Sequence, residues 1–224
     1  MKRSVAIDGP SGAGKSTLAR SVSKKFGFIY VDTGAIYRAV GLYVRQKGVA
    51  PKDAPAVERL LPDIRIDIEY DDDGVQHIIL NGDDVSDKIR EPEISIYASD
   101  VSAMPAVRAF LLDMQRNLAG RYDVVMDGRD IGTVVLPNAT VKIFLTASAE
   151  ARAERRHKEL KEKGIECSYD EVLRDMEYRD KNDSSRAIAP LRPAEDSVLV
   201  DTTELTLEES AEKIAEIISE RIGL

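Results

Sequence analysis

A glycine-rich segment near the start of the chain constrains the fold more than any other feature. Residues 9–16 match the pattern G-x-x-x-x-G-K-[ST], which arises by chance in about one of 200 chains of this composition. An apolar run at residues 4–7 precedes it, and an amphipathic pattern follows Lys15. A glycine-rich loop between a strand and a helix directs backbone N–H groups and the helix dipole toward phosphate. The segment therefore predicts a loop that binds a nucleoside triphosphate, and the residues expected to contact it are Gly9, Pro10, Ser11, Gly12, Ala13, Gly14, Lys15, Ser16 and Thr17.

Two side chains of this phosphate-binding loop (P-loop) and one further carboxylate suit the chemistry of a triphosphate. Lys15 can reach the β- and γ-phosphates, and the Ser16 hydroxyl can ligate Mg²⁺. Asp127 ends an apolar run, where P-loop proteins place a carboxylate that orders Mg²⁺ or its waters; the alternative is that Asp127 caps a turn. For the loop itself, the alternatives are a purely structural turn and a dinucleotide fingerprint, which would need glycine or alanine at Thr17.

Beyond this loop, short apolar runs alternate with amphipathic helical patterns. The runs are nearly continuous, as expected of parallel strands that are covered on both faces. Leu18, Val22 and Phe26 repeat at every fourth position, and a capping box of Thr206 and Glu209 opens the last helix. Strands that alternate with helices predict an α/β fold with a doubly wound parallel sheet. The expected strands are residues 4–7, 28–31, 122–126, 140–146 and 197–201.

One segment departs from this alternation. Residues 64–69 alternate polar and apolar side chains, and residues 76–80 follow after a turn that contains Asp-Gly. This pattern predicts an antiparallel hairpin. Together with residues 83–89 it is expected to form a small β insert at about residues 62–91. Because the chain has no repeat and no Gly/Ser-rich linker, we expect residues 1–224 to form one domain that contains this insert.

The composition argues against several classes of protein. There is no run of about 18 apolar residues, so we expect no membrane-spanning helix. A net charge of −8 argues against nucleic acid or a membrane surface as a partner. The single cysteine, Cys167, cannot form an internal disulfide, which fits a reducing cytoplasm, and two histidines are too few for a histidine-based metal site. We expect a cytoplasmic monomer in which any anion site is built locally.

Four arginines distinguish a kinase from the switch and motor proteins that share the P-loop. Arg38 and Arg129 follow strand ends, where a doubly wound sheet forms its ligand crevice. Arg179 and Arg186 flank a polar segment, residues 180–185, which we expect to be a loop. Each arginine alone is more often a solvated surface charge. Four of them at such positions in an acidic chain predict a cradle for an anionic acceptor.

The chemistry of the transfer favours a phosphate acceptor. A hydroxyl acceptor needs a general base, whereas a phosphate is already an oxyanion and needs cations that offset repulsion between the two phosphate groups. Arginine suits this task because its planar fork binds phosphate in two places and stays charged. The alternatives are a kinase for another small acceptor and a nucleotide-dependent switch, although the Asn-Lys-x-Asp motif of switch GTPases is absent.

A further group of basic residues lies on a predicted helix. Arg152, Arg155 and Arg156 are spaced three and four residues apart, which places them on one helix face. We expect this helix to belong to a mobile lid at about residues 149–168 that closes basic side chains over ATP. The alternative is a solvated helix in which Glu159 pairs with Arg155.

Four segments of the chain resemble bacterial cytidylate kinases, and the resemblance extends over essentially the full length. They are residues 7–17, 32–38, 127–135 and 179–191. The first motif is widespread, and the other three together are specific to this family. The resemblance implies a P-loop NTPase-type fold with a helical lid and an insert that binds the nucleoside monophosphate. It also implies transfer of the γ-phosphate of ATP to CMP or dCMP with Mg²⁺ as cofactor.

By motif position, the resemblance implies roles in the acceptor site. Asp183 would accept hydrogen bonds from the sugar hydroxyls, and Ser99, Arg108 and Asp130 would surround the cytosine. A carboxylate suits the exocyclic amine, which uracil lacks. Thr33 stands where many members have serine, and its hydroxyl can still donate to phosphate. The residues implied to hold or flank the acceptor phosphate and ribose are Arg38, Arg129, Arg179 and Arg186, and the expected catalytic residues are Lys15, Arg129, Arg179 and Arg186.

Overall fold

The computed structural model describes residues 2–223 and has a sheet of five parallel strands at its centre. The strand order is β2-β6-β1-β7-β8, so β1 lies in the middle and pairs with β6 on one side and β7 on the other. The doubly wound parallel sheet that the sequence predicts is confirmed. The strands are β1 (Ser4–Asp8), β2 (Ile29–Asp32), β6 (Val124–Gly128), β7 (Val141–Thr146) and β8 (Val198–Asp201).

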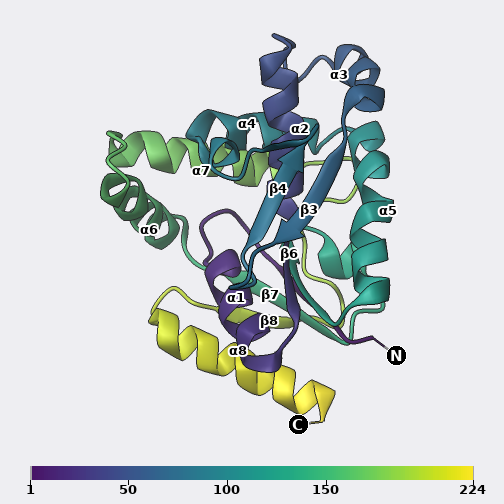
Figure 1. Cartoon of the computed structure of the whole chain (residues 1–224). Coiled ribbons are helices and arrows are strands. Elements are labelled where there is room, and N and C mark those ends of the chain that lie inside the picture. The colour runs from purple at the N-terminus through teal and green to yellow at the C-terminus, as the bar shows by residue number, and fades with distance from the viewer. Residues whose placement is uncertain (1, 224) are drawn as a thin grey trace.

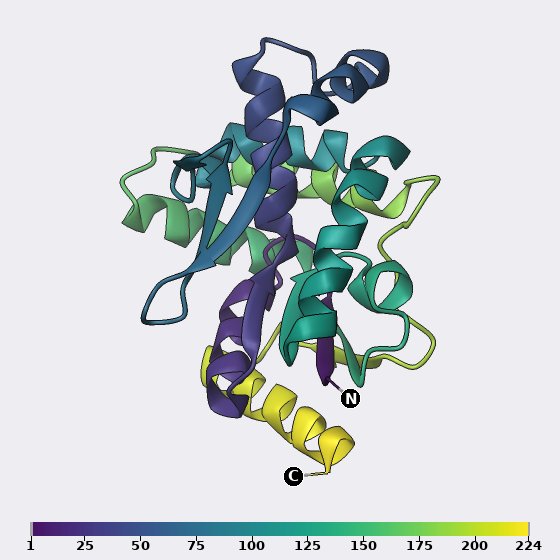
Figure 2. The same ribbon diagram turned by 45° about the vertical axis from the view of Figure 1, so that its right-hand side comes forward.

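Helices cover both faces of this sheet, because successive strand residues point to opposite sides. Val5 and Ile7 are fully buried in the core shared with α1 and α8, whereas Ala6 is fully buried in the core shared with α2, α4 and α5. Figures 1 and 2 show α8 and α3 at opposite ends of the molecule. The helices are α1 (Lys15–Phe26), α2 (Thr33–Gln46), α3 (Ala54–Leu60), α4 (Pro92–Val101), α5 (Pro105–Arg121), α6 (Ala149–Glu162), α7 (Tyr169–Ser184) and α8 (Leu207–Ile222).

The local sequence signals agree with these elements. Each expected strand of the central sheet lies within two residues of an observed one, which is the usual uncertainty of such boundaries. The predicted capping box opens α8: the Thr206 hydroxyl accepts from the N–H of Glu209, whose carboxylate accepts from the N–H of Thr206. The strand β6 continues to Gly128, so Asp127 lies inside the strand and not in the turn that follows it.

The small antiparallel sheet predicted from the period-two segment is also present. It consists of β3 (Ile66–Tyr70), β4 (Gln76–Leu80) and β5 (Asp83–Asp84) in that order. The turn between β3 and β4 contains Gly74, whose φ of 75° favours glycine. One face of the hairpin is apolar, and its residues Ile66, Ile78 and Leu80 are buried in the core that also contains α2.

The insert covers the free edge of the central sheet. Strand β2 is an edge strand, so the outward N–H and C=O groups of alternate residues lack a neighbouring strand. The Tyr70 hydroxyl donates to the carbonyl oxygen of Tyr30 at 2.9 Å. The Gln76 side chain accepts from the N–H of Asp32 at 2.8 Å and donates to its carbonyl oxygen at 3.4 Å. Two side chains of the insert thus replace the backbone partners that a sixth strand would supply.

The helices α6 and α7 form a pair beside the sheet (Figure 1). They pack through a small apolar core that includes Leu160 and Met176. A capping box of Ser168 and Glu171 opens α7, and this helix continues to Ser184. The expectation of a loop at residues 180–185 was therefore wrong, because the helix continues to Ser184. Ion pairs of Asp180 with Arg152 and of Asp183 with Arg129 and Arg186 hold this polar end of the helix in place. No helix in residues 2–223 is long and apolar enough to span a membrane.

Candidate functional site

The P-loop connects β1 to α1, as the sequence predicts, and at two of its glycines a Cβ atom would collide with a neighbouring element. Gly9 has a φ of 152°, and a Cβ atom there would lie 2.0 Å from the carbonyl oxygen of Leu145 on β7. Gly12 has a φ of 74°, and its Cβ would lie 2.7 Å from the Cε atom of Met176 on α7. The loop is therefore held closely between the sheet and the α6–α7 pair.

Lys15 lies at the start of α1 with only 5% of its surface exposed. Its Nζ atom donates to the carbonyl oxygen of Pro10 at 2.6 Å, so the side chain curls over the loop that it belongs to. Burial and the nearby charge of Arg129 lower the pKa of Lys15 to about 7. A polyphosphate bound against this ammonium group would restore its charge, because an anion stabilises the protonated form.

Asp127 forms the centre of a polar group at the end of β6. Its carboxylate accepts from the Ser16 hydroxyl at 2.9 Å and from the Tyr30 hydroxyl at 2.9 Å. Burial, with the charge of Asp32 acting in the same direction, raises the pKa of Asp127 to about 6. Oxygen ligands of this kind suit Mg²⁺, which usually keeps several waters and takes only one or two ligands from the protein. Residues 2–223 contain no cluster of three or more metal-binding side chains, and Mg²⁺ bound with nucleotide phosphates does not need one.

The start of α2 brings Thr33 and Arg38 to the same edge of the sheet. The Thr33 hydroxyl donates to the carbonyl oxygen of Asp127 at 2.7 Å. Asp32 caps α2 through the N–H of Ala35 and forms an ion pair with Arg38 at 2.9 Å. Burial opposes ionisation of Asp32, but the Arg38 charge and the Ala35 N–H together hold its pKa below the ordinary value. Asp32 thus caps α2 and also orients Arg38.

Two of the four predicted arginines share one buried carboxylate. Arg129 leaves the end of β6 and donates from Nε to Asp183 on α7 at 2.7 Å. Arg186 forms an ion pair with the same carboxylate and donates to the Ser102 hydroxyl at 2.7 Å. Asp183 is 3% exposed, and its pKa stays below the ordinary value because the charges of Arg129 and Arg186 outweigh burial.

A second buried ion pair lies beside this group. Arg108 on α5 pairs with Asp130, and its guanidinium group also lies 5.7 Å from the ring centroid of Tyr37. Burial raises the pKa of Asp130, although Arg108 opposes this shift. Ser99 on α4 lies beside Asp183, and its hydroxyl is 3.4 Å from the Asp183 carboxylate. The structure therefore brings together the three residues that the resemblance assigns to the cytosine.

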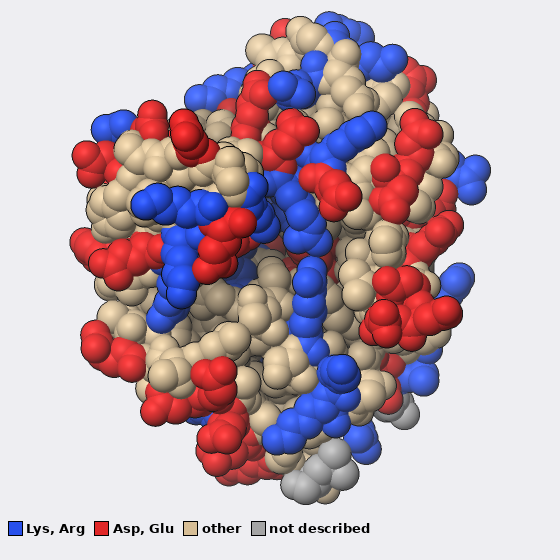
Figure 3. Space-filling view, turned by 60° about the vertical axis from the view of Figure 1, so that its left-hand side comes forward, with Lys and Arg blue, Asp and Glu red and all other residues tan. Residues whose placement is uncertain are grey.

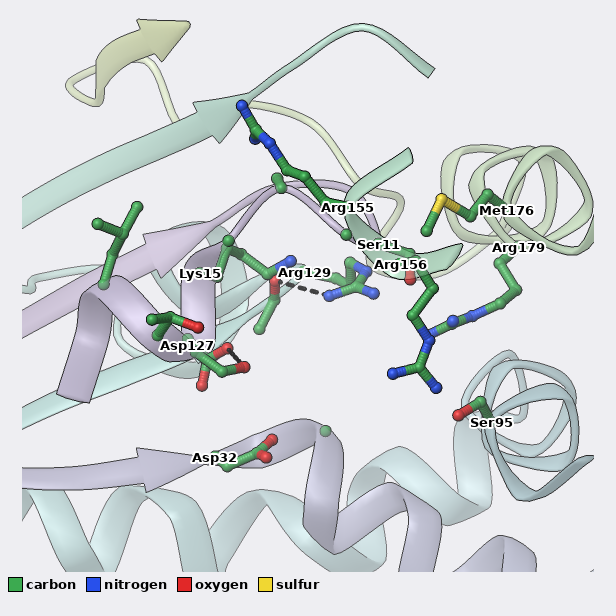
Figure 4. A pocket seen from close by; sticks show the side chains of 18 of the residues that line it. Ser11, Lys15, Asp32, Ser95, Asp127, Arg129, Arg155, Arg156, Met176 and Arg179 are labelled. Carbon is green, nitrogen blue, oxygen red and sulfur yellow. Dashed lines mark hydrogen bonds between the residues drawn. The ribbon is translucent and has the colours of Figure 1, made fainter. Parts of the chain in front are cut away.

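Arg179 differs from Arg38, Arg129 and Arg186 because it forms no ion pair within the described chain. Burial and repulsion from Arg129 lower the pKa of Arg179 to about 10. Its Nε atom is buried without a hydrogen-bond partner in residues 2–223, and the same holds for the Nε atoms of Arg38 and Arg186. In Figure 4, Arg179 and Arg156 reach from α7 and α6 into the pocket that also contains Lys15. These arginines retain unused capacity to bind an anion.

The three arginines of α6 separate into two kinds. Arg155 and Arg156 line the cavity; Arg155 donates to the carbonyl oxygen of Thr202 at 2.6 Å. Arg152 is buried and lies outside the cavity lining; it donates to the carbonyl oxygen of Ser11 at 2.9 Å and pairs with Asp180 at 2.7 Å. Arg152 therefore links the P-loop to α7 outside the cavity, whereas Arg155 and Arg156 face the cavity.

Of the residues that the sequence predicts for the site, all except Gly9, Pro10 and Arg152 border one cavity of about 820 Å³. Twelve basic and six acidic side chains line it, so its lining is basic although the chain as a whole is acidic. Figure 3 shows lysines and arginines gathered around a hollow on this face of the molecule. The cavity runs from the P-loop to the arginines of α2, β6 and α7, and it is large enough for two nucleotides to meet end to end.

Sequence reasoning missed several residues of the site. Asp8, at the end of β1, binds two backbone N–H groups of the segment that follows Asp130. Tyr30 holds Asp127, and Asn182 donates to the hydroxyl and carbonyl oxygens of Ser99. Asp8 and Asn182 lie within segments that resemble the family, but no role could be assigned to them, or to Tyr30, because their partners are distant in sequence. The only available signal was the position of Asp8 and Tyr30 in strands whose ends form the crevice.

The fold and the site together define a P-loop kinase: a phosphate-binding loop faces an arginine-lined pocket within one cavity. A family model described as cytidylate kinase matches residues 5–220. The chain belongs to the cytidylate kinase family.

Individual comparisons agree with this assignment. A cytidylate kinase of Carboxydothermus hydrogenoformans is 52% identical over 217 residues, which cover 97% of each chain. A cytidylate kinase of Caldicellulosiruptor bescii is 50% identical over 216 residues, 96% of this chain and 95% of the relative. Among solved structures, an uncharacterized protein from Eubacterium ventriosum has a TM-score of 0.50 at 11% identity and covers 100% of this chain and 99% of its own. The last likeness shows the fold alone.

Proposed function

We propose that the chain transfers the γ-phosphate of ATP to CMP and dCMP and forms CDP and dCDP. The observation that carries this proposal is the set of three buried Nε atoms, on Arg38, Arg179 and Arg186, that lack partners within the described chain and border the cavity of the P-loop. Unpaired buried donors are costly, and the phosphate and ribose oxygens of a bound nucleotide would remove that cost. The family assignment supplies the acceptor, a cytidine monophosphate.

The donor half of the mechanism uses residues of the P-loop and α6. Backbone N–H groups of residues 11–17 and the Lys15 ammonium hold the β- and γ-phosphates, and Arg155 and Arg156 lie above them. Ser16 and Asp127 would hold Mg²⁺ directly or through water, and this ion offsets phosphate charge when it is bound. The loop that follows β8 and the start of α8 also border the cavity, where Leu205 and Leu207 offer an apolar surface to the adenine.

The acceptor half uses charge and no general base. The acceptor phosphate is already an oxyanion, and Arg38, Arg129 and Arg179 offset its repulsion from the γ-phosphate. Thr33 lies at the same edge, and its hydroxyl would turn from the carbonyl oxygen of Asp127 to donate to the phosphate. Arg186 and Asp183 hold the ribose. Arg108, Asp130 and Ser99 form the pocket for the base, in which a carboxylate accepts from the exocyclic amine of cytosine.

The insert and the α6–α7 pair complete this domain. We propose that the insert, at about residues 62–91, contributes to binding of the monophosphate; Arg90 from this segment lines the cavity. The lid, at about residues 149–168, carries Arg155 and Arg156 over ATP. The domain is proposed to act as a monomer in the cytoplasm with ATP, CMP and dCMP as its partners, and without nucleic acid or membrane partners.

The direct test is a coupled assay of ADP release with ATP, Mg²⁺ and each common nucleoside monophosphate. CMP and dCMP should give kcat/KM values at least about tenfold above those of UMP, AMP and GMP, since a mismatched buried polar group costs about 1–3 kcal/mol. Slow ATP hydrolysis that no monophosphate stimulates would contradict the proposal. Faster turnover with another acceptor would leave the P-loop kinase assignment in place and change the substrate.

A further inference from the structure

Asp8 connects the donor loop to the acceptor loop. It is the last residue of β1 and directly precedes Gly9, the first residue of the P-loop. Its Oδ1 atom accepts from the N–H of Ile131 at 2.8 Å, and its Oδ2 atom accepts from the N–H of Gly132 at 2.7 Å. The segment that it holds begins immediately after Asp130, which lines the cavity.

The position of Asp8 in the sheet explains why such a contact is needed. Strands β1 and β6 pair residue by residue up to Asp8 and Gly128, where the ladder ends. Beyond Gly128 the chain leaves the sheet, so Arg129 and Asp130 lie on a segment without ladder hydrogen bonds. The carboxylate of Asp8 reaches past the end of the ladder and binds the next free N–H groups. It thus extends the alignment of the two strands into the loop that carries the acceptor residues.

The burial of this carboxylate is costly for the folded state. Asp8 is 4% exposed, and burial raises its pKa to about 6 although both N–H groups oppose the shift. Asp130 and Lys15 are the charged groups that act on it, with opposite effects. The held segment is a π-helical turn, Ile131–Val135, and such turns are frequent at functional sites. Because a buried carboxylate lowers the stability of the fold, its presence here indicates that it serves the geometry of the site.

We propose that Asp8 is a positioning residue for phosphoryl transfer, and that it sets the spacing between the P-loop and the acceptor residues Arg129 and Asp130. This inference rests on the proposed function. Asp8 does not line the cavity, so it acts only through the segment that it holds. Transfer between two phosphates depends on the alignment of donor and acceptor, and small displacements of either are costly in rate.

The test compares Asp8→Ala and Asp8→Asn with wild type. Asp8→Ala should lower kcat/KM for CMP by about tenfold to a hundredfold, because two hydrogen bonds to a charged group are lost. The dissociation constant of ATP, measured by calorimetry without acceptor, should change by less than about threefold, since the P-loop keeps its own backbone geometry. Asp8→Asn keeps the side-chain volume and one acceptor oxygen, so kcat/KM for CMP should fall less in this variant than in Asp8→Ala.

A matched control separates positioning from stability. Val5→Ala removes a fully buried side chain from the same strand, away from both loops, and should lower the unfolding temperature while kcat/KM stays within about twofold of wild type. In an Arg129→Ala background, Asp8→Ala should cost less than it does alone, because both changes act on one acceptor loop.

Three results would overturn the inference. They are wild-type kcat/KM in both Asp8 variants, equal losses in Val5→Ala and Asp8→Ala, and a loss that is the same with and without Arg129. If Asp8→Ala does not fold, the same measurements on Asp8→Asn decide. A wild-type protein that fails to phosphorylate CMP would instead contradict the proposed function, so the two failures are distinguishable.

Discussion

The hydroxyl of Ser16 donates to the carboxylate of Asp127 at 2.9 Å, although the two residues are 111 positions apart in the sequence. This bond joins the first turn of α1 to the end of β6 and places a hydroxyl and a carboxylate side by side next to the P-loop. Tyr30 holds the second oxygen of Asp127, so the carboxylate is fixed from both sides. The donor half of the site is therefore assembled by the fold itself.

Replacement of Lys15 should abolish most of the activity. Lys15→Ala is expected to lower kcat by at least about 100-fold, which is the scale for loss of a preorganised group that stabilises charge in the transition state. Steady-state kinetics at saturating ATP and CMP measure this effect. Lys24→Ala, on an exposed position of the same helix, is the control and should match wild type. Near-normal turnover of Lys15→Ala would refute the assignment of the donor site.

Base selection should depend on Asp130. In Asp130→Asn, a pure acceptor becomes a group that also donates, and the ion pair with Arg108 is weakened. The ratio of kcat/KM for CMP to that for UMP should fall by about one to two orders of magnitude. The ratio isolates base choice, because a general weakening of the acceptor site lowers both values. An unchanged ratio in a folded variant would mean that Asp130 only orients Arg108.

The arginines of the acceptor pocket should act as one group. Arg38→Ala, Arg129→Ala and Arg186→Ala should each lower kcat/KM for CMP by about tenfold to a few hundredfold, since each removes charge-assisted bonds worth about 1.5–3 kcal/mol. Lysine at the same positions should restore only part of the loss. Affinity for ATP without acceptor should change little. Wild-type kinetics in all three variants would show that these arginines only stabilise the fold and do not contact the acceptor.

Pairwise combinations sharpen this prediction. Arg129 and Arg186 share the carboxylate of Asp183, so removal of one leaves the other with the whole negative charge. The double variant should therefore differ from the product of the two single effects. Arg38, which pairs with Asp32 instead, should combine with Arg186 more nearly independently. Equal coupling in both pairs would argue against the shared carboxylate.

The pH dependence of stability should reveal the burial of Asp8. Its pKa of about 6 in the folded protein lies above its ordinary value of 3.8, so the folded state binds the proton more tightly. Between about pH 4 and pH 6 the free energy of unfolding should therefore fall as pH rises, by about 3 kcal/mol relative to Asp8→Asn. Denaturant unfolding of both proteins across this range measures the difference. Parallel curves would show that Asp8 is not buried as a titrating group.

Much of the fold could be predicted from sequence because its determinants are local. Apolar runs define the strands, the capping box at Thr206 defines the start of α8, and the Asp-Gly turn defines the hairpin. The polar segment at residues 180–185 misled the prediction, since a helix end without apolar periodicity resembles a loop. The helix is fixed instead by its cap at Ser168 and by packing against α6.

For the site, motif positions identified residues that border the cavity but not how they are arranged. Two arginines share Asp183, and Arg152 is buried against the P-loop. Both arrangements depend on contacts between segments that are distant in the sequence. Asp8 was missed for the same reason: its partners lie 123 and 124 residues away. Such contacts cannot be predicted from the spacing of residues in the sequence.

The side chains of Tyr70 and Gln76 give the hairpin a second consequence, which concerns how copies of the protein behave toward each other. An open edge of a parallel sheet is a template on which another extended chain can pair. Here the outward-facing backbone groups of Tyr30 and Asp32 already form hydrogen bonds with side chains of the insert. A shortened relative that lacked the hairpin would lose this shield along with any substrate contacts. The insert therefore also protects the protein from strand-to-strand aggregation, and this constrains how far the segment can be trimmed.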